Sequence, residues 1–172
     1  MAVYALGDLV PSIDAHAFVH PEASVIGDVT LGPDATVWPS AVLRGDYGSI
    51  VVGPRTSIQD GTVIHAGPGF PTLVGAGCVV GHLVHLEGCR LEDECLVGSN
   101  AVVLHYAVVG TGATVGAGAL VPRNMQVPPG DLALGIPAVL RPGGSRLDGI
   151  RAAAEEYVRN GRRYRADLRR ID

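Results

Sequence analysis

Two histidines and a glutamate fall within six consecutive positions of a chain that has few other clusters of reactive side chains. The stretch VVGHLVHLEGC, from Val79 to Cys89, contains His82, His85 and Glu87. Imidazole and carboxylate groups are common zinc ligands, and a catalytic zinc takes three protein ligands and leaves one position for water. The spacing therefore suggests a metal site. The elements that carry these residues decide which of them can share a metal.

The composition favours many short β-strands joined by tight turns. The chain has 172 residues, enough for one domain with its own core. It contains 24 Gly and 12 Pro but only 2 Phe and 1 Trp, so small residues must fill a narrow interior. The net charge of −4 and the absence of lysine give no electrostatic case for binding nucleic acid.

Neither the cysteines nor the first residues of the chain indicate secretion. Cys78, Cys89 and Cys95 form no CxxC pair, which favours reduced thiols in a cytoplasmic protein. The first residues lack the basic-then-apolar order of a signal peptide, and no run of about 20 apolar residues could span a bilayer. We therefore expect a cytoplasmic protein with no membrane contact. Cys78 and Cys95 are expected in the core, and Cys89 in a turn.

A six-residue repeat organises most of the chain. From Val97 the sequence reads VGSNAV, VLHYAV, VGTGAT and VGAGAL, and each block opens with an aliphatic residue and places a small residue fifth. With insertions, the same frame extends back to LGPDAT at Leu31. Side chains alternate across a strand, so the opener and the small residue two places before it point inward. Such units bury their apolar face only when they stack into coils.

This pattern resembles the hexapeptide-repeat proteins, over roughly Pro11 to Val139. The resemblance implies an all-β, left-handed parallel β-helix with three units in each triangular coil. We therefore expect a β-helix over residues 1–139, a Pro/Gly-rich linker over 140–147 and a C-terminal α-helix over 148–172. Gly161 is expected to weaken or break that helix. Its arginines are expected mainly on a solvated face.

The repeat frame places particular residues side by side. Assigning three units to each coil puts the openers Leu43, Ile64, Leu86 and Val103 on the same face of successive coils. The residues that follow them then form an outward ladder with rungs about 4.8 Å apart: Arg44, His65, Glu87 and Leu104. His82 falls on a different face and cannot meet His65 within one chain. A threefold assembly would bring His65 and Glu87 of one chain to His82 of the next.

Three stretches resemble the γ-class carbonic anhydrases and their bacterial homologues: AVLRGDYGSIVVGPRTSIQDGTVIHAG from Ala41, VGH from Val80, and VPPGDLALGIPA from Val127. The resemblance implies a homotrimer with zinc between subunits, or iron or cobalt in its place. It also implies reversible hydration of CO2 to bicarbonate by metal-bound hydroxide. Two residues match family ligands by position, His65 and His82. Gln59 matches the glutamine that orients the water on the metal, and Arg44, Asp46 and Asp60 match charged residues near the subunit interface.

The third family ligand is replaced here. The family has a histidine five places after His82, where this chain has Glu87, and a histidine stands two places earlier at His85. Three arrangements remain open: Glu87 ligates, His85 reaches across to ligate, or the site holds no functional metal. The loop AGPGFPT, Ala66 to Thr72, also lacks the acid that relays protons in some family members.

Three functions are therefore compared. The first is a metal-dependent carbonic-anhydrase-like hydro-lyase, and the second is a trimer that binds metal with little or no catalysis. The third is a hexapeptide acyltransferase that uses coenzyme A, in which His85 or His105 would be catalytic. The chain offers no acceptor-binding domain, which disfavours the third. His105 is expected near the site, in an interface role.

Overall fold

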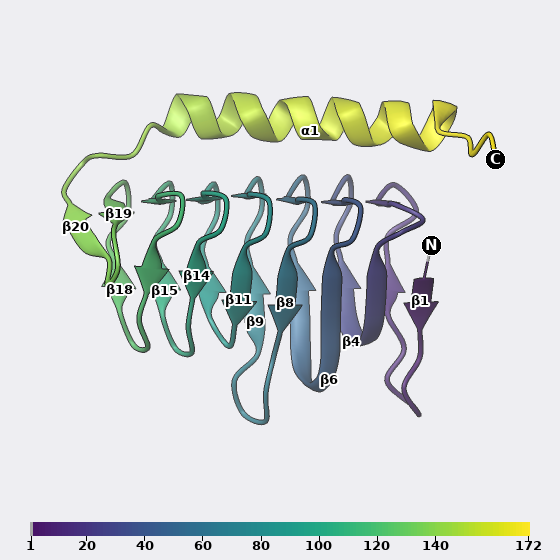
Figure 1. Ribbon diagram of the computed structural model, residues 1–172, viewed down its shortest axis with the longest axis horizontal. Coiled ribbons are helices and arrows are strands. Elements are labelled where there is room, and N and C mark those ends of the chain that lie inside the picture. Colours follow the sequence, from purple (N-terminus) through teal and green to yellow (C-terminus); the bar gives the residue numbers. More distant parts are fainter. Residues whose placement is uncertain (1) are drawn as a thin grey trace.

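The computed structural model describes residues 2–172. It is a left-handed parallel β-helix whose coils have three faces, with one helix, α1 (Leu147–Asp167), lying along it (Figure 1). The all-β hexapeptide fold with a C-terminal helix is therefore confirmed. No helix among residues 2–172 is long and apolar enough to cross a membrane.

Each face is a ladder of short strands from successive coils. The first face runs through β1 (Ala2–Tyr4), the start of β4 (Ser24–Leu31), the start of β6 (Val42–Val52), β8 (Val63–His65), β11 (His85–Glu87), β14 (Val102–Val103) and β17 (Leu120–Val121). The second runs through β2 (Ser12–Ile13), the ends of β4 and β6, β9 (Thr72–Val74), β12 (Arg90–Leu91), β15 (Val108–Val109) and β18 (Gln126–Val127).

The third face carries the helix. It runs through β3 (Phe18–Val19), β5 (Thr36–Val37), β7 (Ser57–Ile58), β10 (Val79–Val80), β13 (Leu96–Val97), β16 (Thr114–Val115) and β19 (Leu132–Leu134). A last strand, β20 (Val139–Arg141), pairs antiparallel with β19. The segment expected as a linker thus begins as a strand that covers the last rung of this face.

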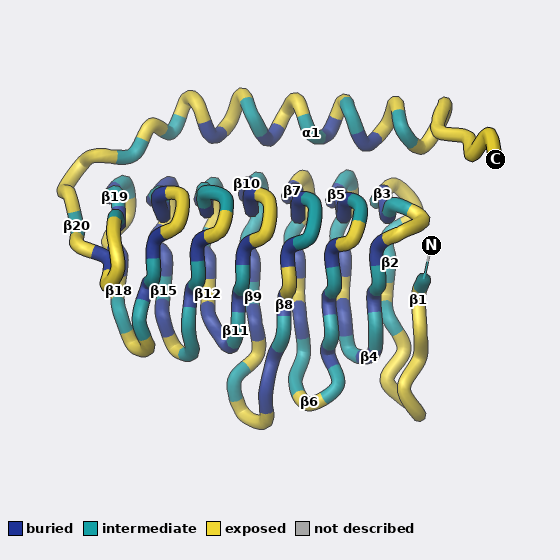
Figure 2. Tube along the Cα trace, in the orientation of Figure 1, coloured by how far each residue is buried: buried dark blue, intermediate teal, exposed yellow. Residues whose placement is uncertain are grey.

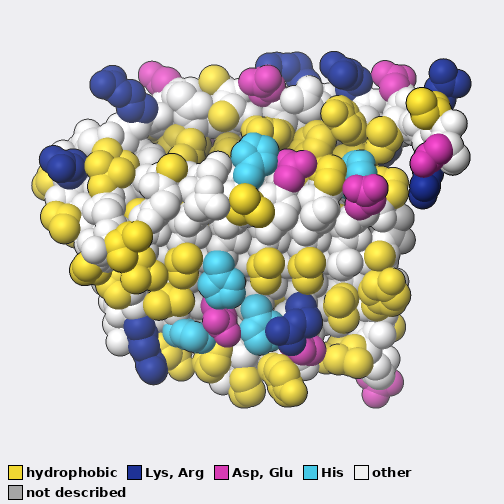
Figure 3. All heavy atoms as spheres, in the orientation of Figure 1, with side chains coloured by type: hydrophobic (Ala, Val, Ile, Leu, Met, Phe, Trp, Pro, Cys, Tyr) yellow, Lys and Arg dark blue, Asp and Glu magenta, His cyan; other side chains and the backbone are white. Residues whose placement is uncertain are grey.

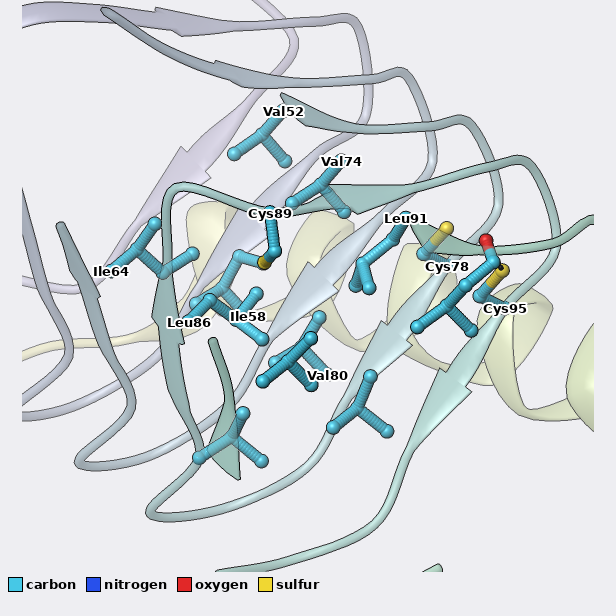
Figure 4. Close-up of a cluster of buried hydrophobic side chains, with 14 of the residues drawn as sticks. Val52, Ile58, Ile64, Val74, Cys78, Val80, Leu86, Cys89, Leu91 and Cys95 are labelled. Carbon is cyan, nitrogen blue, oxygen red and sulfur yellow. Dashed lines mark hydrogen bonds between the residues drawn. The ribbon is translucent and has the colours of Figure 1, made fainter. Parts of the chain in front are cut away.

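The repeat frame gives the correct inward positions. The four openers of the first face are fully buried: Leu43, Ile64, Leu86 and Val103. Figure 2 shows buried positions along the strands and exposed residues at the corners, and Figure 4 shows the aliphatic side chains meeting inside. Cys78 and Cys95 lie in this core, as expected. Cys89 lies in the corner between β11 and β12, but its side chain is also buried, and burial raises its thiol pKa to about 12.

The corner from the third face to the first has a left-handed residue in every coil from Ser40 onward. These residues have φ between 57° and 67°: Ser40, Gly61, Leu83, Asn100 and Gly118. Backbone hydrogen bonds connect successive coils along this corner. The Leu83 N–H donates to the Asp60 carbonyl and the Asn100 N–H to the His82 carbonyl, both at 2.9 Å. Leu83 is unusual among them, because leucine rarely adopts positive φ.

Helix α1 packs on the third face of its own chain. It contacts β3, β5, β7 and β10 through buried residues at helical spacing: Ile150, Ala154, Val158 and Gly161. Arginines pair with the coils, since Arg151 contacts Glu94 and Arg162 contacts Asp34. Some of the helix arginines therefore bind the chain's own coils, where a solvated face was expected.

The helix does not break at Gly161, so one of the two outcomes expected there is wrong. The helix continues through Gly161 to Asp167. A Cβ at Gly161 would lie 2.5 Å from the Cγ2 of Thr36 on β5, so glycine is what allows the helix to approach the strand closely. Thr36 is itself buried, and its hydroxyl accepts a 3.0 Å hydrogen bond from the Trp38 indole.

Candidate metal site

His65 and Glu87 meet on the first face, as the register predicts. His65 ends β8 and Glu87 ends β11, and the two are paired across the ladder. The His65 Nδ1 lies 3.2 Å from the Glu87 Oε1, although 22 positions separate the residues. Figure 3 shows histidine side chains gathered beside acidic ones on this side of the molecule. The strand ladder alone therefore assembles half of the candidate site.

His65 lies between two carboxylates. Its Nε2 is 3.0 Å from the Asp46 Oδ1, while its Nδ1 faces Glu87. A neutral imidazole has one N–H and can donate to only one of them. The second contact requires another proton or a cation between nitrogen and oxygen. When Asp46 accepts from Nε2–H, Nδ1 turns its lone pair toward Glu87, which is the arrangement of a metal-ligating histidine oriented by a carboxylate.

The carboxylates of this half are held in the ionised form. Burial alone would raise the pKa of Glu87, but hydrogen bonds from His65 and His85 and the charges of His105 and His85 bring that pKa below its usual value. Burial likewise opposes the lowering at Asp46, where hydrogen bonds from His65 and Arg44 prevail and lower the pKa. Arg44 also forms an ion pair with Asp46 within the same chain.

His85 shares its strand with Glu87 and faces the other carboxylate oxygen. The His85 Nε2 lies 3.3 Å from the Glu87 Oε2, so the two side chains contact each other directly. The two candidates for the third metal ligand, Glu87 and His85, therefore lie next to each other. The geometry brings Glu87, and not His85, into contact with His65.

His82 lies apart, at the corner that leads onto the first face. It follows β10, its side chain is 50% exposed, and its Nδ1 is 2.9 Å from the Asp60 Oδ2. This contact leaves Nε2 as the ring atom that can bind another partner. Gln59 precedes Asp60 and is buried at the same corner. One chain therefore groups Gln59, Asp60 and His82 at one edge of the face.

The two groups do not meet within one chain. His65 and Glu87 lie at the ends of β8 and β11, His85 lies at the start of β11, and His82 lies at the corner before it. Among residues 2–172, no three His, Cys, Asp or Glu side chains stand in an arrangement that could hold a metal ion. The donor types nevertheless suit zinc, because imidazole and carboxylate oxygen are its ordinary ligands with sulfur.

His105 is closer to the site than the sequence indicated. Its Nε2 lies 3.5 Å from the Glu87 Oε1, and the Phe70 ring packs against it edge-on with ring centroids 4.7 Å apart. Phe70 belongs to the acid-free loop, where Gly67 and Phe70 exchange backbone hydrogen bonds. The repeat frame placed His105 one coil beyond Glu87. The position of the loop phenylalanine had no signal in the sequence.

Comparisons with known proteins agree with the repeat. The family model described as "Bacterial transferase hexapeptide (six repeats)" matches residues 88–123. The chain is 43% identical over 137 residues to "Gamma carbonic anhydrase 2, mitochondrial" of Arabidopsis thaliana, which covers 76% of this chain and 49% of that protein. It is 44% identical over 115 residues to "Probable carbonic anhydrase" of Methanocaldococcus jannaschii, covering 67% and 72%. The chain thus spans about half the length of the plant relative.

A solved structure has nearly the same fold. The hexapeptide transferase family protein from Anaplasma phagocytophilum superposes with a TM-score of 0.91 at 34% identity. The match covers 95% of this chain and 98% of that one. The similarity therefore extends over the coils and the C-terminal region together.

Proposed function

The chain belongs to the γ-carbonic-anhydrase-like family of hexapeptide-repeat proteins, and we propose from this premise that it is a metal-dependent hydro-lyase that interconverts CO2 and bicarbonate. One observation carries the proposal. His65 faces two carboxylates, Asp46 and Glu87, with only one N–H to give in its neutral form. A divalent cation bound by Nδ1 and Glu87 would satisfy this arrangement.

The site is completed by a second subunit in this proposal. His65 and Glu87 of one protomer and His82 of its neighbour supply three donors, which is the number that a catalytic zinc takes. The two halves lie at opposite edges of one face, so neighbouring subunits of a closed trimer would bring unlike edges together. Zinc is the first candidate, with iron or cobalt as alternatives, because two imidazoles and one carboxylate suit all three.

The chain's own residues would prepare and hold the reactants. Asp46 fixes the His65 ring by accepting from Nε2–H, and Asp60 fixes the His82 ring through Nδ1. Gln59, next to Asp60, would orient the attacking water across the interface. Arg44 and the two aspartates would also join the subunits. The metal, when bound, supplies a Lewis acid that makes water nucleophilic near neutral pH.

Glu87 sets the expected strength of this catalysis. A carboxylate adds a negative charge where the family has a neutral imidazole, which weakens the Lewis acid. We therefore expect a slower enzyme whose rate rises toward alkaline pH. The loop from Ala66 to Thr72 also has no acidic side chain that could accept the proton released by the water. Slow release of this proton would limit turnover further.

Metal analysis and a CO2 hydration assay test the proposal together. The protein is purified without chelator, its zinc, iron and cobalt contents are measured, and hydration is assayed with each metal. We expect about one metal per subunit, and loss of metal and activity in His65→Ala and in His82→Ala. His16→Ala is the matched control, since His16 is an exposed histidine that contacts only Asp14. A wild-type protein without metal would overturn the proposal.

Mixed trimers test whether the site is shared between subunits. Refolding His65→Ala and His82→Ala chains together creates interfaces in which one chain supplies an intact His65 and its neighbour an intact His82. By random assortment, roughly a quarter of the sites recover both groups. Activity and metal should therefore reappear in the mixture although each variant alone has neither. No recovery in verified mixed trimers would contradict a shared site.

Two other functions remain as alternatives. A trimer that binds metal with little or no catalysis is favoured by Glu87 and by the acid-free loop, and metal at full occupancy with background hydration under all conditions would identify it. An acyltransferase is suggested by the fold shared with a hexapeptide transferase family protein. Turnover of acetyl-CoA with a panel of amines and alcohols, lost in His85→Ala or His105→Ala, would identify that one.

A further inference from the structure

We propose that His105 is a positioning residue that holds the Glu87 carboxylate in the orientation needed to bind the metal. This inference rests on the proposed function and adds to it a residue from a third coil. It explains how a glutamate can work at a place where the family has a rigid imidazole. Leu86 pairs with Val103, so the next rung after Glu87 is occupied by Leu104, and His105 comes one place later at the corner that follows β14.

Three imidazoles bracket the Glu87 carboxylate. The Oε1 lies 3.2 Å from the His65 Nδ1 and 3.5 Å from the His105 Nε2. The Oε2 lies 3.3 Å from the His85 Nε2. A glutamate side chain has three rotatable bonds, and fixing them costs more entropy than fixing a histidine. The three histidine contacts to the two Glu87 carboxylate oxygens restrict these bond rotations before the metal binds.

His105 is itself fixed by packing. The Phe70 ring meets it at an interplanar angle of 86°, an edge-to-face contact. Gly88, directly after Glu87, leaves room for both rings, because a Cβ there would lie 2.6 Å from Phe70 and 3.1 Å from His105. The loop that lost its acid thus supplies the phenylalanine that holds His105 against Glu87.

Metal affinity and the visible spectrum of the cobalt form test this role. Zinc and cobalt affinities are measured by chelator competition for the wild type, His105→Ala, His105→Gln and Phe70→Ala. Removing a polar side chain that contacts a metal-ligating group costs about 10–100-fold in metal affinity. We expect this loss in His105→Ala, a smaller loss in Phe70→Ala, and a shifted cobalt absorption band in both. His105→Gln should recover most of the affinity, because its amide N–H occupies the place of Nε2–H.

A double-variant cycle assigns the effect to Glu87. In a Glu87→Gln background, His105→Ala should cause little further loss, since the charge it positions is gone. Unchanged affinity and spectrum in His105→Ala would overturn the inference, as would an undiminished loss in the Glu87→Gln background. His16→Ala again serves as the control.

The result separates this inference from the proposed function. If the wild type binds metal, its hydration rate stays at background and His105→Ala lowers its metal affinity, the proposed function is overturned and the role of His105 is supported. Normal hydration with no effect of His105→Ala supports the proposed function and overturns the role. A wild type without metal overturns both.

Discussion

The turn that contains His82 is expected to be destabilised by a leucine in a left-handed backbone conformation, and a substitution should relieve this strain. Leu83 follows His82 with φ 57°, at a corner where the next coil has Asn100 with φ 60°. The two are equivalent, because Val80 pairs with Val97 and each lies three places further on. Leu83→Asn should therefore stabilise the protein. The reverse exchange, Asn100→Leu, should destabilise it.

The magnitude follows from the backbone and the exposure. A residue with a bulky side chain loses about 1–2 kcal/mol in the left-handed conformation, whereas asparagine adopts it routinely. Leu83 is 60% exposed, so replacing it removes little buried apolar area in the single chain. We expect a gain of about 1 kcal/mol for Leu83→Asn and a loss of similar size for Asn100→Leu. In a protein of this length each corresponds to about 2–4 °C in Tm.

Urea unfolding and thermal unfolding at one fixed protein concentration measure both variants. The concentration is fixed, and assembly is followed by light scattering, because association changes apparent stability. The reasoning is refuted if the two exchanges do not change stability in opposite directions. If Leu83→Asn stabilises the protein and also weakens metal binding, then the strained leucine is retained for the site beside it, as stability–activity trade-offs predict.

Three further outcomes are expected. Glu87→His should raise metal affinity and the hydration rate near neutral pH, and a metal-loaded variant with an unchanged rate would contradict the account of Glu87. Gly149→Ala should stabilise the helix by up to about 1 kcal/mol, since nothing lies near its Cβ position, while Gly161→Ala should destabilise it through the 2.5 Å contact, as thermal unfolding can measure. Hydrogen bonds from Arg162 lower the pKa of Asp34 below 3.8, so their contribution is present above pH 3.8 and is lost as the pH falls through the lowered value. The stability difference between wild type and Arg162→Ala should accordingly vanish in acid and persist at neutral pH.

Two periods in the sequence predict how the coils stack, whereas the left hand and the three units per coil were predicted from the family resemblance. The six-residue period fixes which residues stack, and the two-residue alternation of a strand fixes which of them point inward. The pairing of His65 with Glu87 follows from these periods alone, across 22 positions. The course of the helix at Gly161 does not, because it depends on a close approach to a strand residue 125 positions earlier, and propensity describes only the isolated helix.

The repeat frame predicts contacts within the candidate site only where its residues lie on strands, and the corner residues Gln59, Asp60 and His82 were identified from the family resemblance. Glu87 and His65 sit inside the ladder, whereas His105 and Phe70 lie at the corners, where the chain changes direction and alternation no longer decides how side chains point. The contact between His105 and Glu87 therefore needed the structure. The acid-free loop was identified from its sequence as missing a proton acceptor, but its packing role could not be.

The order of carboxylate and imidazole groups along the first face explains why Glu87 should be judged together with His105. From coil to coil, carboxylate and imidazole alternate through Asp46, His65, Glu87 and His105, each within 3.5 Å of the next. A carboxylate can accept a hydrogen bond from an imidazole N–H on either side, whereas three neighbouring imidazoles have no carboxylate oxygen between them. Glu87→His alone would place three imidazoles in a row and weaken the gain expected from a better ligand. Adding His105→Asp leaves two imidazoles side by side but gives the new imidazole a carboxylate neighbour, as Asp46 is for His65. The double variant should therefore bind zinc more tightly than Glu87→His alone, and weaker binding by the double variant would show that a carboxylate beside position 87 does not strengthen the site.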